Sequence, residues 1–259
     1  MKLAVACVSP MAADPAENLA LLRALAFEAA GLGAALVLFP ERFAMGRVTA
    51  EAAEAAAELS DGPTARALAR IAAAARVGLL VGYVERCVTG LYTAALLLDA
   101  EGHAIANYRQ THRPTVPDEA VLGHGHWLTI MPFGAHRLGL LIGYDLEFPE
   151  PARALALAGC DLIVAAGGVT GVRPEVAAAV VAARAVENGC WVAYADAGPL
   201  GRIVGPDGRA AAGGAGPRLL LADVASPSRS PAGGRFAARR PRLYAELARI
   251  EEELPARPI

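Results

Sequence analysis

The amino-acid sequence predicts an α/β protein, and three observations support this. Short apolar runs with the length of buried strands alternate with stretches whose apolar residues have helical spacing. These segments form two strand–helix–strand halves of unlike sequence. The chain has 259 residues, of which 55% are hydrophobic and 19% charged, so it can bury one large core. We therefore expect one domain over residues 1–259.

The first half opens with an expected strand over residues 2–9 and a helix that starts at Asp14-Pro15. Aspartate is a common N-cap, and proline suits the first helical position. A second buried strand over 34–39 ends in Pro40-Glu41. Burying a carboxylate without partners is costly, so we expect Glu41 to face a polar site.

The remaining elements follow from the same patterns of apolar spacing, capping residues and turns. Expected helices lie at 50–59, 63–75, 149–158 and 174–188, and expected strands at 78–85, 91–99, 103–110, 138–142, 161–165, 191–195, 201–204 and 218–223. The helix over 149–158 matters most, because Pro149 follows a sharp break at Gly143 where a buried strand ends. A residue at such a break is presented to the carboxyl edge of the sheet, where nucleophiles often sit.

Charge and cysteine content exclude several classes of protein. The formal net charge is −2, which argues against nucleic acid or an anionic membrane as the main partner. No apolar run approaches the length of a membrane span. The four cysteines (Cys7, Cys87, Cys160 and Cys190) lie far apart in apolar contexts, so we expect reduced thiols and a cytoplasmic protein.

Three segments carry a family resemblance. They are LVLFPE at Leu36–Glu41, YRQTH at Tyr108–His112 and RLGLLIGYDLEFPE at Arg137–Glu150. Together they resemble the nitrilase superfamily, the carbon–nitrogen hydrolases that include amidases and carbamoylases. The resemblance runs along nearly the whole chain and implies a four-layer α-β-β-α sandwich, with two sheets face to face and helices outside.

The resemblance also implies roles for particular residues. Glu41 matches the general-base glutamate of the family. Gln110 stands at the position of its electrophilic lysine, and Gly143 at that of its nucleophilic cysteine. The loop after Tyr108–His112 often brings a second glutamate, for which Asp118 and Glu119 are the two candidates.

Other expectations concern ligands and partners. Tyr144 and His112 are candidate ligand-binding side chains for a small amide-like molecule. The pair His124 and His126 has no carboxylate-rich ligand frame beside it, so we expect no metal site, and the sequence implies no cofactor.

The ending R-R-P-x-L-Y at Arg239–Tyr244 resembles a C-terminal extension of the family, here residues 226–259, that commonly packs across a dimer partner. We therefore expect a homodimer or a larger homo-oligomer.

Three hypotheses of function remain open from the sequence. The first is a pseudoenzyme that binds a small amide-like ligand or a protein partner without turnover. The second is an active enzyme on an amide- or nitrile-like molecule that uses Glu41 with Asp118 or Glu119 and forms no covalent intermediate. The third is an ordinary amidase whose cysteine and lysine were replaced deliberately. Thiol-dependent hydrolysis requires a nucleophile that Gly143 cannot supply.

Overall fold

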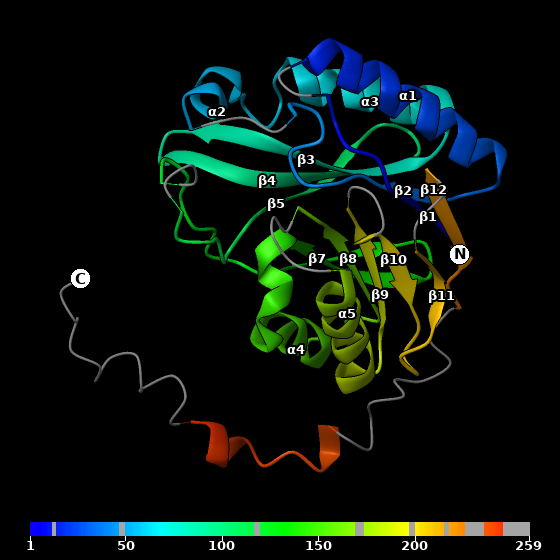
Figure 1. The fold of residues 1–259 in the computed structure, drawn as a ribbon, viewed down its shortest axis with the longest axis vertical. Coiled ribbons are helices and arrows are strands. Elements are labelled where there is room, and N and C mark those ends of the chain that lie inside the picture. Colours follow the sequence, from blue (N-terminus) through cyan, green and yellow to red (C-terminus); the bar gives the residue numbers. More distant parts are fainter. Residues whose placement is uncertain are drawn as a thin grey trace.

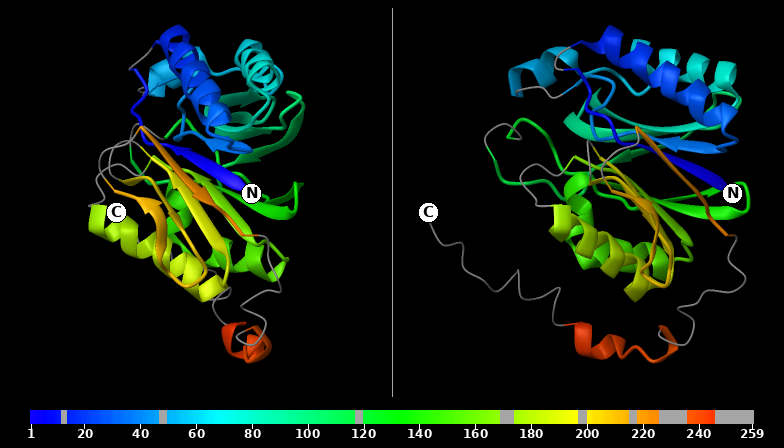
Figure 2. Two further views of the ribbon diagram at one scale, coloured as in Figure 1. Left: turned by 90° about the vertical axis from the view of Figure 1, so that its right-hand side faces the viewer. Right: turned by 45° about the vertical axis from the view of Figure 1, so that its right-hand side comes forward.

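The computed structural model describes residues 1–11, 14–46, 50–116, 120–168, 174–196, 200–214, 218–225 and 236–245. Two six-stranded sheets pack face to face, and helices cover the outer face of each (Figure 1). The turned views of Figure 2 show the same succession of helix, sheet, sheet and helix layers. The predicted four-layer α-β-β-α sandwich is therefore confirmed.

The first sheet has the order β12-β1-β2-β3-β4-β5. Its strands are β1 (Lys2–Ala6), β2 (Leu36–Leu38), β3 (Gly78–Cys87), β4 (Gly90–Leu98), β5 (Ala104–Arg109) and β12 (Leu219–Asp223). Strands β1, β2 and β3 run parallel, and the others pair antiparallel. The outer helices are α1 (Pro15–Gly31), α2 (Ala50–Ala56) and α3 (Pro63–Ala75). As predicted, Asp14 caps α1, accepting a hydrogen bond from the Glu17 amide at 3.0 Å.

The second sheet has the order β11-β10-β9-β8-β7-β6. Its strands are β6 (Thr129–Phe133), β7 (His136–Ile142), β8 (Leu162–Ala166), β9 (Trp191–Ala195), β10 (Arg202–Val204) and β11 (Ala210–Gly213). Helices α4 (Pro149–Leu157) and α5 (Pro174–Asn188) cover its outer face. The sequence patterns did not predict β6 and β11, which are the two edge strands of this sheet.

The core follows from the two-residue period of the strands. Leu3 and Val5 of β1 belong to the cluster that fills the space between the sheets. Ala4 and Ala6, which point the other way, pack under the helices with residues such as Leu22. This alternation gives the first sheet two buried faces, which explains why its strands read as continuous apolar runs.

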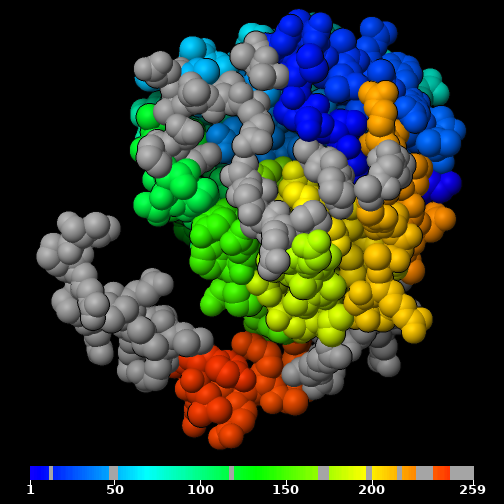
Figure 3. Space-filling model, viewed as in Figure 1, coloured from blue at the N-terminus to red at the C-terminus, as the bar shows by residue number. Residues whose placement is uncertain are grey.

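Two strands, one from each sheet, bring the candidate site together. The chain leaves β2 towards Glu41, and it leaves β7 directly into a 3₁₀ turn, η2 (Gly143–Glu147). The remaining described element is a second 3₁₀ turn, η4 (Pro241–Tyr244), which Figure 3 places beside the α4–α5 layer. Within the described ranges, no helix has the length and apolar character needed to cross a membrane.

Candidate functional site

Glu41 is held in the turn that follows β2. Its Oε1 accepts hydrogen bonds from Nε of Arg42 at 3.0 Å and from Nη2 at 2.8 Å. The Glu41 side chain is 7% exposed, so this ion pair is largely shielded from solvent. Arg42 has a φ of 52°, in the left-handed region that non-glycine residues rarely adopt. A Cβ at Gly82 of β3 would collide with the backbone of both residues, so only glycine allows this close approach.

Gln110 follows β5 and is 3% exposed. Its Nε2 donates a hydrogen bond to the carbonyl oxygen of Ile142 at 3.1 Å. Its backbone amide donates to the Thr93 carbonyl at 2.9 Å, and its backbone carbonyl accepts from the amide of Gly125 at 2.7 Å. The Ile142 carbonyl can only accept, so it fixes which end of the Gln110 amide faces the end of β7.

Gly143 lies where the side chains of Glu41 and Gln110 converge. Its φ is +40°, a conformation that costs glycine little and other residues more. A Cβ built at this position would collide with Oε2 of Glu41 and would lie 3.5 Å from Nε2 of Gln110. The structure therefore brings Glu41, Gln110 and Gly143 to one point, as the sequence resemblance implies.

The segment that follows β8 packs against Glu41 beside Gly143. The Gly167 carbonyl accepts a hydrogen bond from the Glu41 amide. A Cβ at Gly168 would lie 2.6 Å from both Cβ and Oε2 of Glu41, so no side chain fits there without movement. The sequence predicts only a glycine-rich turn after this strand, and it does not predict the contact with Glu41, which joins segments far apart in the chain.

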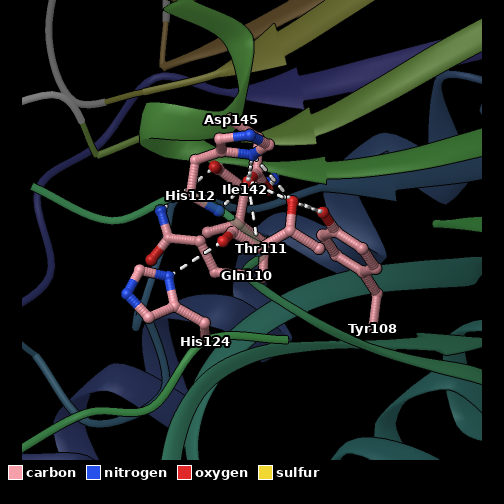
Figure 4. A network of polar contacts seen from close by, with 7 residues as sticks. All are labelled: Tyr108, Gln110, Thr111, His112, His124, Ile142 and Asp145. Atoms are coloured by element: carbon pink, nitrogen blue, oxygen red, sulfur yellow. Dashed lines mark hydrogen bonds and ion pairs between the residues drawn. The ribbon is translucent and has the colours of Figure 1, made fainter. Parts of the chain in front are cut away.

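Asp145 is the centre of a buried hydrogen-bond network beside Gly143 (Figure 4). It is fully buried, and its Oδ2 accepts from the Tyr108 hydroxyl at 2.8 Å and from the Ile142 amide at 3.0 Å. Its Oδ1 accepts from the amide and the hydroxyl of Thr111 and from the amide of His112. Burial and the neighbouring carboxylate raise the pKa of Tyr108 well above its usual value, so its hydroxyl stays a donor. The network joins the end of β5 to the end of β7.

The two predicted ligand-binding side chains both pack on Phe148. The ring of His112 stacks on Phe148 with centroids 4.5 Å apart, and Tyr144 meets it edge-on at 5.2 Å. Nδ1 of His112 also lies 3.2 Å from Oδ1 of Asp145. These contacts give both residues a structural role at the start of α4, and their part in ligand binding stays a prediction.

The candidate second carboxylates, Asp118 and Glu119, lie outside the described residues. The loop that follows them returns to the site, because Nδ1 of His124 lies 3.0 Å from the Thr111 carbonyl oxygen. Within the part of the chain that is described, no three His, Cys, Asp or Glu side chains are grouped to hold a metal ion.

Arg184 of α5 holds the turn that carries Gly143. Its Nε donates to the Leu146 carbonyl at 3.0 Å, and its Nη2 to the Glu147 carbonyl at 2.8 Å. The pairing of Arg184 with Glu187, expected from their spacing on one helix face, is confirmed at 3.1 Å. The bonds to the turn are a tertiary contact that helical spacing could not predict.

The structure combines a sandwich of two sheets with a buried carboxylate, Glu41, that faces a strand-to-turn break. The family comparison assigns a class to this arrangement. Residues 2–228 match the carbon–nitrogen hydrolase family, and the chain belongs to that family.

Among curated relatives, a protein of Pseudomonas protegens called "Hydrolase in pqqF 5′ region" is 41% identical over 199 residues, 76% of this chain and 69% of the relative. An (R)-stereoselective amidase of a Pseudomonas species is 31% identical over 181 residues, 69% of this chain and 63% of the amidase.

Among solved structures, the amidase of Nesterenkonia sp. AN1 superposes with a TM-score of 0.82 and 27% identity, covering 95% of this chain and 99% of that one. Mutants of that amidase have been solved in complex with acrylamide or butyramide, and in one mutant acrylamide has added to the active site cysteine.

Proposed function

We propose that this protein is a catalytically degenerate carbon–nitrogen hydrolase that binds a small amide-like molecule without thiol-dependent turnover. The observation that carries the proposal is the glycine at position 143, on which the Glu41 carboxylate and the Gln110 amide converge. Amides are the ligands of the Nesterenkonia amidase, which supports an amide-like ligand for the same fold.

The proposal follows from what covalent catalysis requires. A nucleophile must attack the amide carbon, and Gly143 has no side chain to do so. Removing a nucleophile from a cooperating set costs up to about 10⁶ in rate. Gln110 can donate only neutral hydrogen bonds, which are roughly half as strong as those from a charged donor. The glutamate alone is therefore a binding group for N–H donors.

A second candidate function is hydrolysis without a covalent intermediate. The observation that favours it is the retained Glu41, shielded from solvent and held in one orientation by Arg42. In this alternative Glu41 activates a water molecule, with Asp118 or Glu119 as the second carboxylate.

Steady-state assays of the purified protein on amides, carbamoyl amino acids and nitriles separate the two functions. We expect no turnover, together with saturable binding of small amides by NMR titration. Hydrolysis that Glu41→Gln abolishes would replace the binding function with the non-covalent enzyme.

Introducing a cysteine at position 143 and a lysine at position 110 provides a further test. Cys87→Ser serves as the background because it removes the native thiol whose pKa is lowered. In that background Gly143→Cys should react only modestly with iodoacetamide, because Gln110 carries no charge to stabilise the thiolate and the Arg42 guanidinium is bound to Glu41. Adding Gln110→Lys should raise that labelling rate and bring weak amidase activity. Equal labelling of the single and double variants would mean that Gln110 does not occupy the lysine position.

The proposal extends to the assembly and location of the protein. We propose one domain with a C-terminal extension from residue 226, a homodimer or larger homo-oligomer built on α4 and α5, and a cytoplasmic location. Exposed Leu157 and Val176 on these helices support the dimer, as does a groove of about 580 Å³ between α4 and the segment with Arg239 and Tyr244. All four cysteines are free, which suits a reducing compartment.

A further inference from the structure

Thr93 of β4 is a buried polar residue whose hydroxyl is unpaired. It is 2% exposed, and its Oγ1 finds no hydrogen-bond partner among the described residues. The register that pairs Ala94 with Arg109 places Thr93 directly opposite Gln110, and the Gln110 amide donates to the Thr93 carbonyl. Residues directly opposite in an antiparallel pair share one face of the sheet, so both side chains lie on the same face. A buried hydroxyl left unpaired destabilises the fold unless a ligand completes its hydrogen bond.

The same face of the sheet carries the segment that contains Glu41. Thr93 pairs with Val84, and its neighbour two residues on, Ala95, pairs with Gly82. The backbone of Glu41 rests against the face of Gly82, where a Cβ would collide with it. The unpaired hydroxyl therefore belongs to the inner face on which Glu41 and Gln110 meet Gly143.

The groups gathered there are mostly acceptors. Nε2 of Gln110 is engaged with the Ile142 carbonyl, which leaves Oε1 as the acceptor end of this side chain. Arg42 binds Oε1 of Glu41, whereas Oε2 is the oxygen that faces Gly143. The Thr93 hydroxyl adds one more possible acceptor. A lysine in place of Gln110 would bring a positive charge and three donors, whereas the glutamine brings no charge and adds an acceptor oxygen.

We infer that this site takes an amidinium group, in preference to the corresponding amide and to the carboxylate. An amidinium is planar, has N–H donors on both nitrogens, carries a positive charge and has no acceptor. It therefore matches Glu41 Oε2, Gln110 Oε1 and the Thr93 hydroxyl together. An amide donates from one nitrogen only, and a carboxylate presents two acceptors to a carboxylate. The inference rests on the proposed function, since it names the ligand class of that binding site.

NMR titration of the full chain with acetamidinium, acetamide and acetate tests this directly, because the three ligands have nearly the same shape. We expect acetamidinium to bind roughly tenfold more tightly than acetamide, the gain of one charge-assisted contact. Acetate should bind most weakly. Equal affinities, or tighter binding of acetamide, would overturn the inference.

Two variants assign the preference to the named residues. Gln110→Lys should abolish or reverse the preference for acetamidinium, because it places a cation beside the ligand. Thr93→Val should weaken acetamidinium binding severalfold and leave the melting temperature unchanged or higher, since it removes an unpaired buried hydroxyl without changing shape. The matched control is Thr89→Val, at the exposed turn between β3 and β4, which should bind like the wild type. If either variant fails to fold, the wild-type affinity ratio decides alone.

The outcomes separate this inference from the proposed function. Binding of acetamide with no preference for acetamidinium refutes the inference and leaves the proposed function intact. Hydrolysis of acetamide refutes the proposed function, and the ratio of inhibition constants then still decides the amidinium preference. If none of the three ligands binds, both are wrong.

Discussion

Gly143 accepts a backbone conformation and a close contact that a side chain would find costly. Two effects add at this position, the φ of +40° and the collision of any Cβ with Glu41. Left-handed backbone costs a non-glycine residue about 1 kcal/mol, and overpacking adds about 1–3 kcal/mol. We expect Gly143→Ala to lower the free energy of unfolding by roughly 2–4 kcal/mol in urea denaturation.

A matched glycine separates the two effects. Gly134 also has a positive φ, +57°, and a Cβ there would meet nothing within 4 Å. Gly134→Ala should therefore cost only the backbone contribution, about 1 kcal/mol. Equal losses for the two variants would show that Glu41 does not crowd position 143.

Cys87 is the native thiol that we expect to react at neutral pH. A hydrogen bond with Thr89, whose oxygen lies 3.0 Å from Sγ, lowers the pKa of Cys87 below its usual 9.0. Burial raises the pKa of Cys7 to about 11 and that of Cys160 to about 12, so both stay protonated thiols. Burial raises the pKa of Cys190 as well.

Iodoacetamide followed by peptide mass spectrometry checks this expectation. At pH 7.5 one site, Cys87, should be modified, and Cys87→Ser should abolish labelling of the folded protein. Because the thiolate is the reacting form, the rate at Cys87 should rise with pH to a plateau whose midpoint lies below 9.0. Rapid labelling of Cys160 in the folded state would contradict the burial argument.

At the scale of elements, α5 positions the turn that begins at Gly143. Arg184 is 8% exposed and bonds the Leu146 and Glu147 carbonyls. Arg184→Met keeps the apolar stem but leaves the buried Leu146 carbonyl and the partly buried Glu147 carbonyl without their donor. We expect a loss of roughly 2–4 kcal/mol in the free energy of unfolding, measured by thermal or urea denaturation.

The control for this variant is Glu187→Gln. It weakens the ion pair but leaves the two carbonyl contacts of Arg184 in place. The Glu187 side chain is 32% exposed, so its loss of charge should cost well under about 1 kcal/mol. A larger effect at Glu187 than at Arg184 would assign the stabilisation to the ion pair instead of the turn.

At the scale of the whole molecule, the outer face of α4 and α5 is the surface we propose for self-association. Leu157 of α4 is 45% exposed, and Leu243 and Tyr244 of the nearby C-terminal turn are also exposed. Leu157→Asp should convert the oligomer to monomer in light scattering at micromolar concentration, since it places a charge in an apolar contact. Leu32, at the end of α1 and 49% exposed, provides the control, and Leu32→Asp should not change the mass. A wild type that is monomeric would refute the assembly.

The sequence by itself determined the layers of this fold and the convergence of three site residues. Continuous apolar runs predicted most strands, because a strand that is buried on both faces requires apolar side chains at every position. The strand-to-turn break at Gly143 and the family resemblance predict that Glu41 and Gln110 lie at the same point.

The tertiary structure alone decided the features that depend on contacts between distant segments. Strand β6 was missed because its residues are half-buried and include Pro132, and β11 because Ala-Ala-Ala-Gly has little strand propensity. The unpaired Thr93 hydroxyl could not be predicted either, since the sequence of a strand does not show which groups pack against its threonine. Hydrogen-bond satisfaction depends on packing between strands far apart in sequence, and local spacing does not encode it.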